Sequence, residues 1–190
     1  MILGITGGTG CGKTTLLREI EGLGGLILDC DAIYHDLLRT NREMLGAIEA
    51  RFPGTVEQGS LNRKKLGAIV FSDEKALLDL NKITHGAVKK EVRRRLEAQP
   101  RLAAIDAIGL FEGGLAELCD TTVAVTAPEE ARVQRLVARE GISAEYARNR
   151  IRAQKDEAHF REICDHTLAN DGTLEEFQTK CRRFLTQILD

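Results

Sequence analysis

Gly7-Gly8-Thr9-Gly10-Cys11-Gly12-Lys13-Thr14 is the stretch that decides the fold of this chain. It fits the pattern G-x-x-x-x-G-K-[ST], in which glycines let backbone N–H groups turn toward phosphate oxygens. An apolar run at residues 2–6 precedes it, and an amphipathic pattern at residues 13–23 follows it. The positive N-terminal end of such a helix attracts the same anion. The stretch therefore predicts a strand, a phosphate-binding loop and a helix, rather than a glycine-rich turn without a ligand.

The residue types in this loop suit a nucleoside triphosphate such as ATP with Mg²⁺. Lys13 has the length to reach the β- and γ-phosphates, and the hydroxyl of Thr14 is a ligand for Mg²⁺. The backbone of the loop would hold the remaining phosphate oxygens. The residues expected to bind ATP are Gly8, Thr9, Gly10, Cys11, Gly12, Lys13, Thr14 and Thr15.

The composition is that of an ordinary globular protein of one-domain size, with 190 residues, 43% hydrophobic and 29% charged. A net charge of −2 argues against nucleic acid as a partner. No apolar run approaches the roughly 20 residues of a membrane span, and the first residues lack a signal-peptide pattern. Five cysteines, none at C-x-x-C spacing, indicate reduced thiols rather than disulfides or zinc. We therefore expect a cytoplasmic protein with no membrane or nucleic-acid partner.

Short apolar runs alternate with helical patterns along the chain. Strands are expected at residues 2–6, 26–28, 102–108, 122–126 and 166–168. Helices are expected at residues 13–23, 32–51, 61–71, 73–98, 127–139 and 144–160, and at the C-terminus. Strands separated by helices predict a parallel sheet with right-handed crossovers. The fold class is thus α/β, a three-layer P-loop NTPase fold with about five mainly parallel strands.

Three helix starts carry capping signals. Ser72 is a favourable N-cap for the long helix that follows it. Thr126 with Glu129, and Thr173 with Glu176, have the spacing of capping boxes. Each signal predicts where a helix begins.

Two short patterns resemble guanine-nucleotide motifs. Residues 106–109, beginning with Asp106, fit D-x-x-G, and residues 81–84 nearly fit N-K-x-D. The second lacks the aspartate that reads guanine, and it precedes the first instead of following it. We interpret both as structural and do not expect a GTPase.

Asp29-Cys30-Asp31 stands directly after the second expected strand. In parallel α/β sheets ligands gather at the carboxyl ends of strands. A carboxylate there can bind Mg²⁺ through water or accept a proton from an attacking hydroxyl. The alternative for one of the two aspartates is a helix N-cap, and the pair allows both roles.

Segments in a characteristic order along the chain point to one family. They are residues 4–15, 28–31, 59–66, 70–71, 80–85, 110–112, 134–139, 152–154 and 170–172. With these, the chain resembles the dephospho-CoA kinases nearly end to end. That family phosphorylates the ribose 3′-hydroxyl of dephospho-CoA with ATP to give CoA. The resemblance thus implies ATP and dephospho-CoA as partners and Mg²⁺ as the cofactor.

The resemblance also implies roles for single residues. Asp31 matches the general base, and Arg139 matches an arginine that closes over the ATP phosphates, so the implied catalytic residues are Asp31, Lys13 and Arg139. Asn170 and Gly172 would lie by the adenine of ATP. Arg63, His85 and Glu112, together with Asp31, match the acceptor side. Arg63 could instead be a surface helix residue, and His85 a structural histidine at a helix end.

The domain organisation expected from this resemblance is a single P-loop kinase domain over residues 1–190. It would carry a helical acceptor-side insert over about residues 53–98 and a lid over about residues 132–155, with Gly141 as a flexible point. The sequence makes no prediction of oligomeric state.

Two departures from the family pattern concern the acceptor side. Gly86 follows His85 where the family usually has proline, and Ile108-Gly109 replaces a Pro-Leu pair. These residues change backbone rigidity and remove no group that phosphoryl transfer needs. The alternatives are another small-molecule kinase, with a nucleotide or sugar-like alcohol as acceptor, and a nucleotide-binding switch without useful turnover.

Overall fold

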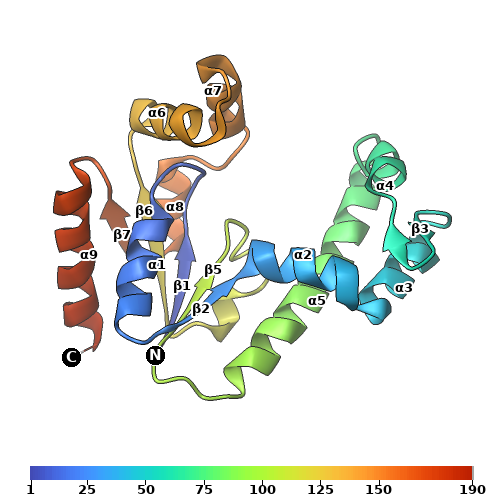
Figure 1. Ribbon diagram of the computed structural model, residues 1–190, viewed down its shortest axis with the longest axis horizontal. Coiled ribbons are helices and arrows are strands. Elements are labelled where there is room, and N and C mark those ends of the chain that lie inside the picture. Colours follow the sequence, from blue (N-terminus) through green and yellow to red (C-terminus); the bar gives the residue numbers. More distant parts are fainter. Residues whose placement is uncertain (190) are drawn as a thin grey trace. The chain divides into compact units, whose positions relative to one another are not determined.

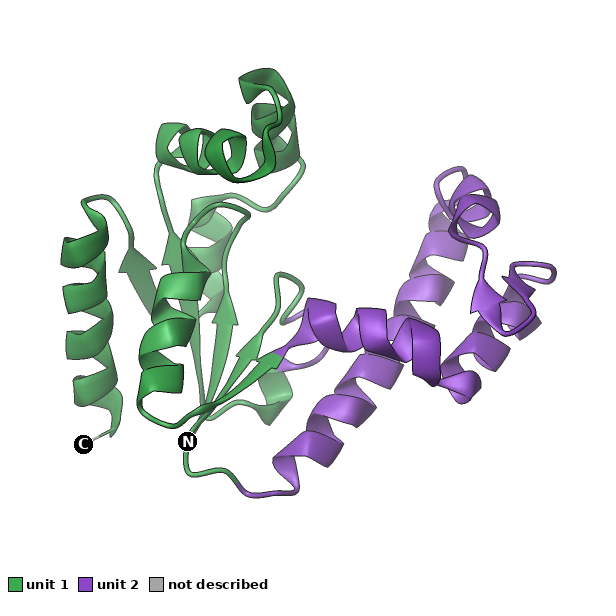
Figure 2. Cartoon of the chain, viewed as in Figure 1, with its two compact units in different colours: residues 1–28, 100–110, 116–190 green, residues 29–99, 111–115 purple. Residues whose placement is uncertain are grey.

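The computed structural model describes residues 1–189 (Figure 1). The chain divides into two compact units, coloured separately in Figure 2. Unit 1 comprises residues 1–28, 100–110 and 116–190, and unit 2 comprises residues 29–99 and 111–115. The segment predicted as an insert, residues 53–98, lies within unit 2, which begins earlier, at Asp29.

A five-stranded sheet confirms the predicted fold class. Its strands, in spatial order, are β2 (Leu26–Asp29), β5 (Ala103–Asp106), β1 (Ile2–Thr6), β6 (Thr121–Thr126) and β7 (His166–Ala169). The pairs β1–β5, β1–β6 and β6–β7 are parallel. Because β1 lies in the middle, the loop that follows it opens at the centre of the carboxyl edge of the sheet.

The central strand is apolar because helices and neighbouring segments cover it. Leu3 and Ile5 are fully buried, and they share a core with Leu16 of α1 (Lys13–Gly22) and Phe177 of α9 (Leu174–Leu189). Figure 1 shows α1 and α9 side by side. α8 (Glu157–Ile163) packs against β6 and β7. This packing fixes the position of β1 and therefore of the loop.

Two helices that were predicted as continuous are each broken, so those predictions were wrong. Residues 30–51 form α2 (Cys30–Thr40) and α3 (Arg42–Arg51), and Asn41 between them caps α3 by accepting the Met44 N–H at 2.8 Å. α7 (Ala144–Arg152) ends before α8, which Asp156 caps through the His159 N–H at 2.8 Å. Asn and Asp side chains compete with helical hydrogen bonds in this way.

The capping signals had mixed outcomes. Thr173 and Glu176 form the predicted box, because the Glu176 carboxylate accepts the Thr173 N–H at 2.7 Å and the Thr173 hydroxyl accepts the Glu176 N–H at 3.2 Å. Thr126 ends β6 instead of capping α6 (Glu129–Glu140), whose N-cap is Pro128. Asp73, not Ser72, caps α5 (Glu74–Leu96).

Unit 2 is built around the long helix α5, against which α2, α3 and α4 (Arg63–Val70) pack. It also contains a hairpin that the sequence did not predict, formed by β3 (Val56–Glu57) and β4 (Ser60–Leu61). Gln58 and Gly59 connect the strands with positive φ angles of 50° and 78°, as tight hairpin turns require.

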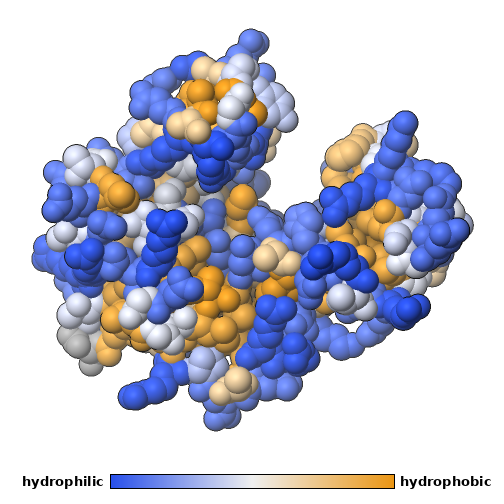
Figure 3. Space-filling view, viewed as in Figure 1, coloured by the Kyte–Doolittle hydropathy of each residue, from blue (hydrophilic) through white to orange (hydrophobic). Residues whose placement is uncertain are grey.

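Helices α6 and α7 of unit 1 have a small core of their own, made by Val133, Leu136, Ala147 and Ile151. Figure 3 shows hydrophobic atoms over these helices, at the top of the view, within a largely hydrophilic surface. Within residues 1–189, none of the helices has the length and hydrophobicity needed to span a membrane.

Candidate active site

The phosphate loop runs from the end of β1 at Thr6 to the start of α1 at Lys13. Gly12 is the N-cap of α1 with a φ of 102°, and a Cβ there would lie 2.3 Å from Nδ2 of Asn170. Only glycine suits both the backbone conformation and this close approach. Gly12 makes no side-chain cap, so the positive N-terminal end of α1 remains open to an anion.

Three consecutive carbonyl oxygens of the loop accept hydrogen bonds from side chains elsewhere in unit 1. The donors are Arg132 Nε to Thr9 (2.8 Å), Arg135 Nη1 to Gly10 (3.1 Å) and Asn170 Nδ2 to Cys11 (2.9 Å). In a trans peptide the C=O and the following N–H point in opposite directions. The N–H groups of Gly10 and Gly12 therefore point away from these side chains, which is the arrangement of an anion-binding nest.

The charged and hydroxyl side chains expected to act on phosphate lie at the start of α1. Lys13 is half-buried, and its Nζ donates to the Gly7 carbonyl at 3.1 Å, so the ammonium group lies over the loop. Thr14 is exposed and Thr15 is half-buried. Cys11 is buried, and burial raises the pKa of its thiol, so it acts as a neutral packing residue beneath the loop.

Asp106 is a candidate residue that the sequence interpretation set aside as structural. It ends β5, and Ile5 of β1 is its register partner. Burial raises the pKa of the Cys11 thiol, and the negative charge of Asp106 adds to that rise, which places the carboxylate near the loop. Its position after a buried strand was the available signal, the same one that drew attention to Asp29 and Asp31.

Two arginines of the lid-like segment donate hydrogen bonds to the loop, and Arg139 is not one of them. Arg132 and Arg135, three residues apart on one face of α6, hold loop carbonyls. Arg139 lies at the end of α6, exposed, in an ion pair with Glu140, which also pairs with Arg150. The sequence interpretation chose Arg139 and missed the two loop contacts, although Arg135 stood in a family-like segment. The role of Arg139 stays a prediction.

Gly141 ends α6 in the left-handed conformation, with a φ of 68°. This is an ordinary helix C-cap, and the N–H of Gly141 donates to Val137 O at 2.9 Å. Its expected role as a flexible point stays a prediction.

Asn170 is buried, and both its backbone N–H and its side-chain amide donate hydrogen bonds within unit 1. Its backbone N–H donates to Thr126 O at 2.8 Å, and its side chain supports the loop at Cys11. Gly172 is exposed just before the capping box that starts α9. Contact of either residue with adenine stays a prediction.

The four residues expected on the acceptor side all fall in unit 2 (Figure 2). Asp29 caps α2, accepting the Ala32 N–H at 3.0 Å, which leaves Asp31 exposed in the first turn of that helix. One aspartate of the pair is thus the N-cap, as the alternative interpretation allowed. The role of Asp31 as a general base stays a prediction.

Arg63 is the first residue of α4 and is exposed. Burial raises the pKa of the Tyr34 hydroxyl, and the charge of Arg63 opposes that rise, so the guanidinium lies near Tyr34, one turn beyond Asp31 on α2. His85 is half-buried in the middle of α5, not at a helix end. Glu112 is exposed within residues 111–115. Their contacts with an acceptor stay predictions.

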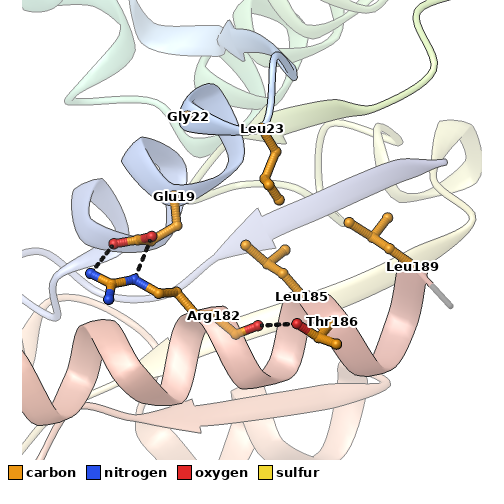
Figure 4. A pocket seen from close by; sticks show the side chains of 7 residues that line it. All are labelled: Glu19, Gly22, Leu23, Arg182, Leu185, Thr186 and Leu189. Atoms are coloured by element: carbon orange, nitrogen blue, oxygen red, sulfur yellow. Dashed lines mark hydrogen bonds and ion pairs between the residues drawn. The ribbon is translucent and has the colours of Figure 1, made fainter.

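A groove of about 470 Å³ lies between α1 and α9, away from the loop. Figure 4 shows Leu23, Leu185 and Leu189 along it and the ion pair of Glu19 with Arg182 at its side. Gly22, the last residue of α1, also lines it. Its lining on α1 begins at Glu19, six residues and about 9 Å along the helix from Lys13, so the groove is separate from the phosphate loop.

Comparison with known proteins agrees with this geometry. The family model described as dephospho-CoA kinase matches residues 1–176. A dephospho-CoA kinase of Corynebacterium diphtheriae is 34% identical to this chain, and the match covers 98% of each. Among solved structures, a Thermus thermophilus protein matches with a TM-score of 0.80 and 34% identity over 98% of this chain and 97% of that one.

A dephospho-CoA kinase structure from Campylobacter jejuni matches with a TM-score of 0.69 over 98% of this chain and 96% of that one. Its sequence identity of 24% makes this a likeness of fold. The family match, in contrast, covers most of the chain and includes the phosphate loop, the Asp29–Asp31 segment and the lid-like segment. The chain belongs to the dephospho-CoA kinase family.

Proposed function

We propose that this chain transfers the γ-phosphoryl group of ATP to the ribose 3′-hydroxyl of dephospho-CoA, which yields CoA. The observation that carries the proposal is the family match over residues 1–176, which includes the phosphate loop. Side chains of unit 1 hold three carbonyl oxygens of this loop, which supports an arrangement with N–H groups turned toward an anion. The phosphate loop supports ATP as the phosphoryl donor, and the family match supports dephospho-CoA as the acceptor.

The donor side acts by positioning and by charge. Phosphoryl transfer passes through a loose transition state, so the protein mainly aligns the reactants in line and neutralises charge on the transferring group. The loop N–H groups and Lys13 would hold the β- and γ-phosphates, and Arg139 would turn from Glu140 to the γ-phosphate. Residues 8–15, with Asn170 and Gly172, form the proposed ATP site.

Mg²⁺ is the proposed cofactor. Within residues 1–189 no group of three or more His, Cys, Asp or Glu side chains could hold a metal ion by itself. The residues present fit the alternative, in which Mg²⁺ keeps waters and takes few protein ligands beside phosphate oxygens. Thr14 would supply its hydroxyl, and Asp106 would accept hydrogen bonds from the metal-bound water. When bound, the ion neutralises charge on the β- and γ-phosphates.

On the acceptor side we assign the general base to Asp31. Its carboxylate is exposed at the first turn of α2, and the N-cap role is already filled by Asp29. It would orient the ribose hydroxyl and accept its proton as the new P–O bond forms. Arg63, His85 and Glu112 are the further residues proposed to contact dephospho-CoA.

We also propose that both compact units act together as one kinase domain in the cytoplasm, with residues 132–155 as the lid and residues 53–98 as the acceptor-side insert. All five cysteines are free thiols, which suits a reducing compartment. The net charge of −2 favours small molecules over nucleic acid as partners.

A coupled assay of ADP release tests the function across dephospho-CoA, AMP, CMP, shikimate and gluconate. We expect acceptor-dependent release with dephospho-CoA and little with the others. Turnover confined to another acceptor would overturn the substrate assignment. Tight nucleotide binding without any acceptor-dependent release would instead indicate a nucleotide-binding switch.

A further inference from the structure

Gln154 closes a ring of three hydrogen bonds with Thr9 and Arg132. Its Oε1 accepts from the backbone N–H of Thr9 at 2.8 Å and from Nη2 of Arg132 at 3.1 Å. Arg132 Nε in turn donates to the carbonyl oxygen of Thr9 at 2.8 Å. Both backbone polar groups of Thr9 are therefore held by the same pair of side chains.

This pair of side chains lies directly on the loop. A Cβ at Gly8 would stand 2.2 Å from Arg132 Nη2 and 3.1 Å from Gln154 Oε1. Burial lowers the pKa of the Arg132 guanidinium, which nevertheless stays charged at physiological pH. A half-buried charge needs hydrogen-bond partners, and Gln154 and Thr9 provide two of them.

The ring also joins the loop to the lid-like segment. Gln154 follows α7, and its own N–H donates to Ile151 O at 3.1 Å, which ties it to the end of that helix. Ile151 belongs to the small core that packs α7 against α6, the helix that carries Arg132. The two side chains of the ring therefore come from one packed helix pair.

We propose that Gln154 is a positioning residue for ATP. By holding Arg132 on the Thr9 carbonyl, it fixes the Thr9–Gly10 peptide so that the Gly10 N–H faces the phosphates. It thereby links the lid-like segment to the phosphate loop. The proposal rests on the proposed function only in that the loop binds ATP.

The test replaces Gln154 with methionine, which keeps the length of the side chain and removes the acceptor. Calorimetric titration of the full chain with ATP and Mg²⁺ measures the nucleotide affinity. Because both hydrogen bonds of Gln154 exist without ATP, only part of their strength is expected to be lost from binding. A part equal to one ordinary hydrogen bond corresponds to a loss of roughly 2- to 13-fold. The matched control is Gln134→Met, the same change at an exposed position of α6, which we expect to leave the affinity unaltered.

Two further measurements separate positioning from a merely structural role. In Gln154→Met the KM for ATP should rise while the KM for dephospho-CoA and the Tm without nucleotide match those of Gln134→Met. Combining Gln154→Met with Arg132→Met should lose less affinity than the sum of the two single losses, because Gln154 and Arg132 hold the same peptide and each other.

The proposal is overturned if Gln154→Met binds ATP as Gln134→Met does, or if the two KM values rise equally as the Tm falls. Additive losses in the double variant would also contradict it. The titration needs no acceptor, so it tests Gln154 even if the acceptor panel overturns the proposed substrate. A wild-type chain that does not bind ATP would overturn both proposals.

Discussion

Arg132 and Thr9, 123 residues apart in sequence, are joined by a hydrogen bond of 2.8 Å from the guanidinium Nε to the carbonyl oxygen. This contact explains the glycine at position 8 better than backbone conformation does. Gly8 is not among the glycines with positive φ, but Arg132 Nη2 occupies the place of its Cβ. Gly8 stands at a variable position of the motif, and a side chain from α6 is what requires glycine there.

Gly8→Ala should consequently weaken ATP binding at least about tenfold, since the new Cβ displaces Arg132 from Thr9. Gly22→Ala is the matched control, because a Cβ at that glycine of α1 has open space around it. Titration with ATP measures both variants, and circular dichroism checks that both are folded. Equal affinities in the two variants would show that Arg132 does not hold the loop.

Asp31→Asn should lower kcat by about 10²- to 10⁴-fold, because the amide cannot accept the proton of the ribose hydroxyl. Asp29→Asn is the control next to it. Asparagine caps helices as well as aspartate does, so the cap on Ala32 survives and activity should stay within about twofold of wild type. Steady-state kinetics with dephospho-CoA compares them. If Asp31→Asn keeps turnover within a few-fold of wild type, the base assignment is wrong.

Asp165 should make stability depend on pH in the acid range. The hydroxyl and the N–H of Thr122 hold the pKa of this carboxyl below its usual value. A group with a lowered folded pKa stabilises the fold above its unfolded pKa, near 3.9, and loses that contribution as pH falls through the folded value. Asp165→Asn should therefore destabilise the chain at pH 7 by about 1 kcal/mol, a value reduced for solvent screening.

The same substitution should have a smaller effect at about pH 3, where the carboxylate is becoming protonated. Urea unfolding at the two pH values measures the difference. Glu162→Gln, at an exposed position of α8, serves as the control and should show little effect at either pH. If Asp165→Asn destabilised the chain equally at both pH values, the effect could not come from the lowered pKa of the Asp165 carboxyl.

The parts of the fold that could be predicted are those specified by local pattern. The strand before Gly7, the helix after Lys13 and the box of Thr173 with Glu176 each depend on residues within a few positions of one another. The break at Asn41 was missed because the apolar spacing continues through it. The extended backbone of Asn41 and its side-chain bond to the Met44 N–H mark where one helix ends and the next begins.

In the candidate site, too, the residues that could be predicted are those specified by a local pattern. The phosphate loop could be predicted because its chemistry is contained in eight consecutive residues. Arg132 and Gln154 could not, because each acts on Thr9 across more than a hundred residues of sequence. An arginine on a charged helix has no local signature that distinguishes a loop contact from a solvated surface. Arg139 was named from the family resemblance, and nothing in the sequence pointed to Arg132.

Gly86→Ala should stabilise the chain by about 0.5–1 kcal/mol. This glycine lies inside α5, where the family usually has proline, and a Cβ there would have open space around it. Glycine in a helix interior is less favourable than alanine because its unfolded state has more conformational freedom. Gly67→Ala is the contrasting variant, since its Cβ would lie 3.2 Å from the Phe71 ring. Urea unfolding that shows no gain for Gly86→Ala would contradict the argument.

Arg139 and Arg150 both pair with Glu140, which makes them a matched test of the lid. Removal of either loses an exposed ion pair, worth little for stability. Only Arg139 is proposed to move to the γ-phosphate, where it would stabilise charge in the transition state. Arg139→Met should therefore lower kcat by about 10- to 1,000-fold, whereas Arg150→Met should stay within about twofold. Equal effects of the two substitutions on kcat would remove Arg139 from the catalytic residues and leave Lys13 and the loop N–H groups as the ligands of the transferring group.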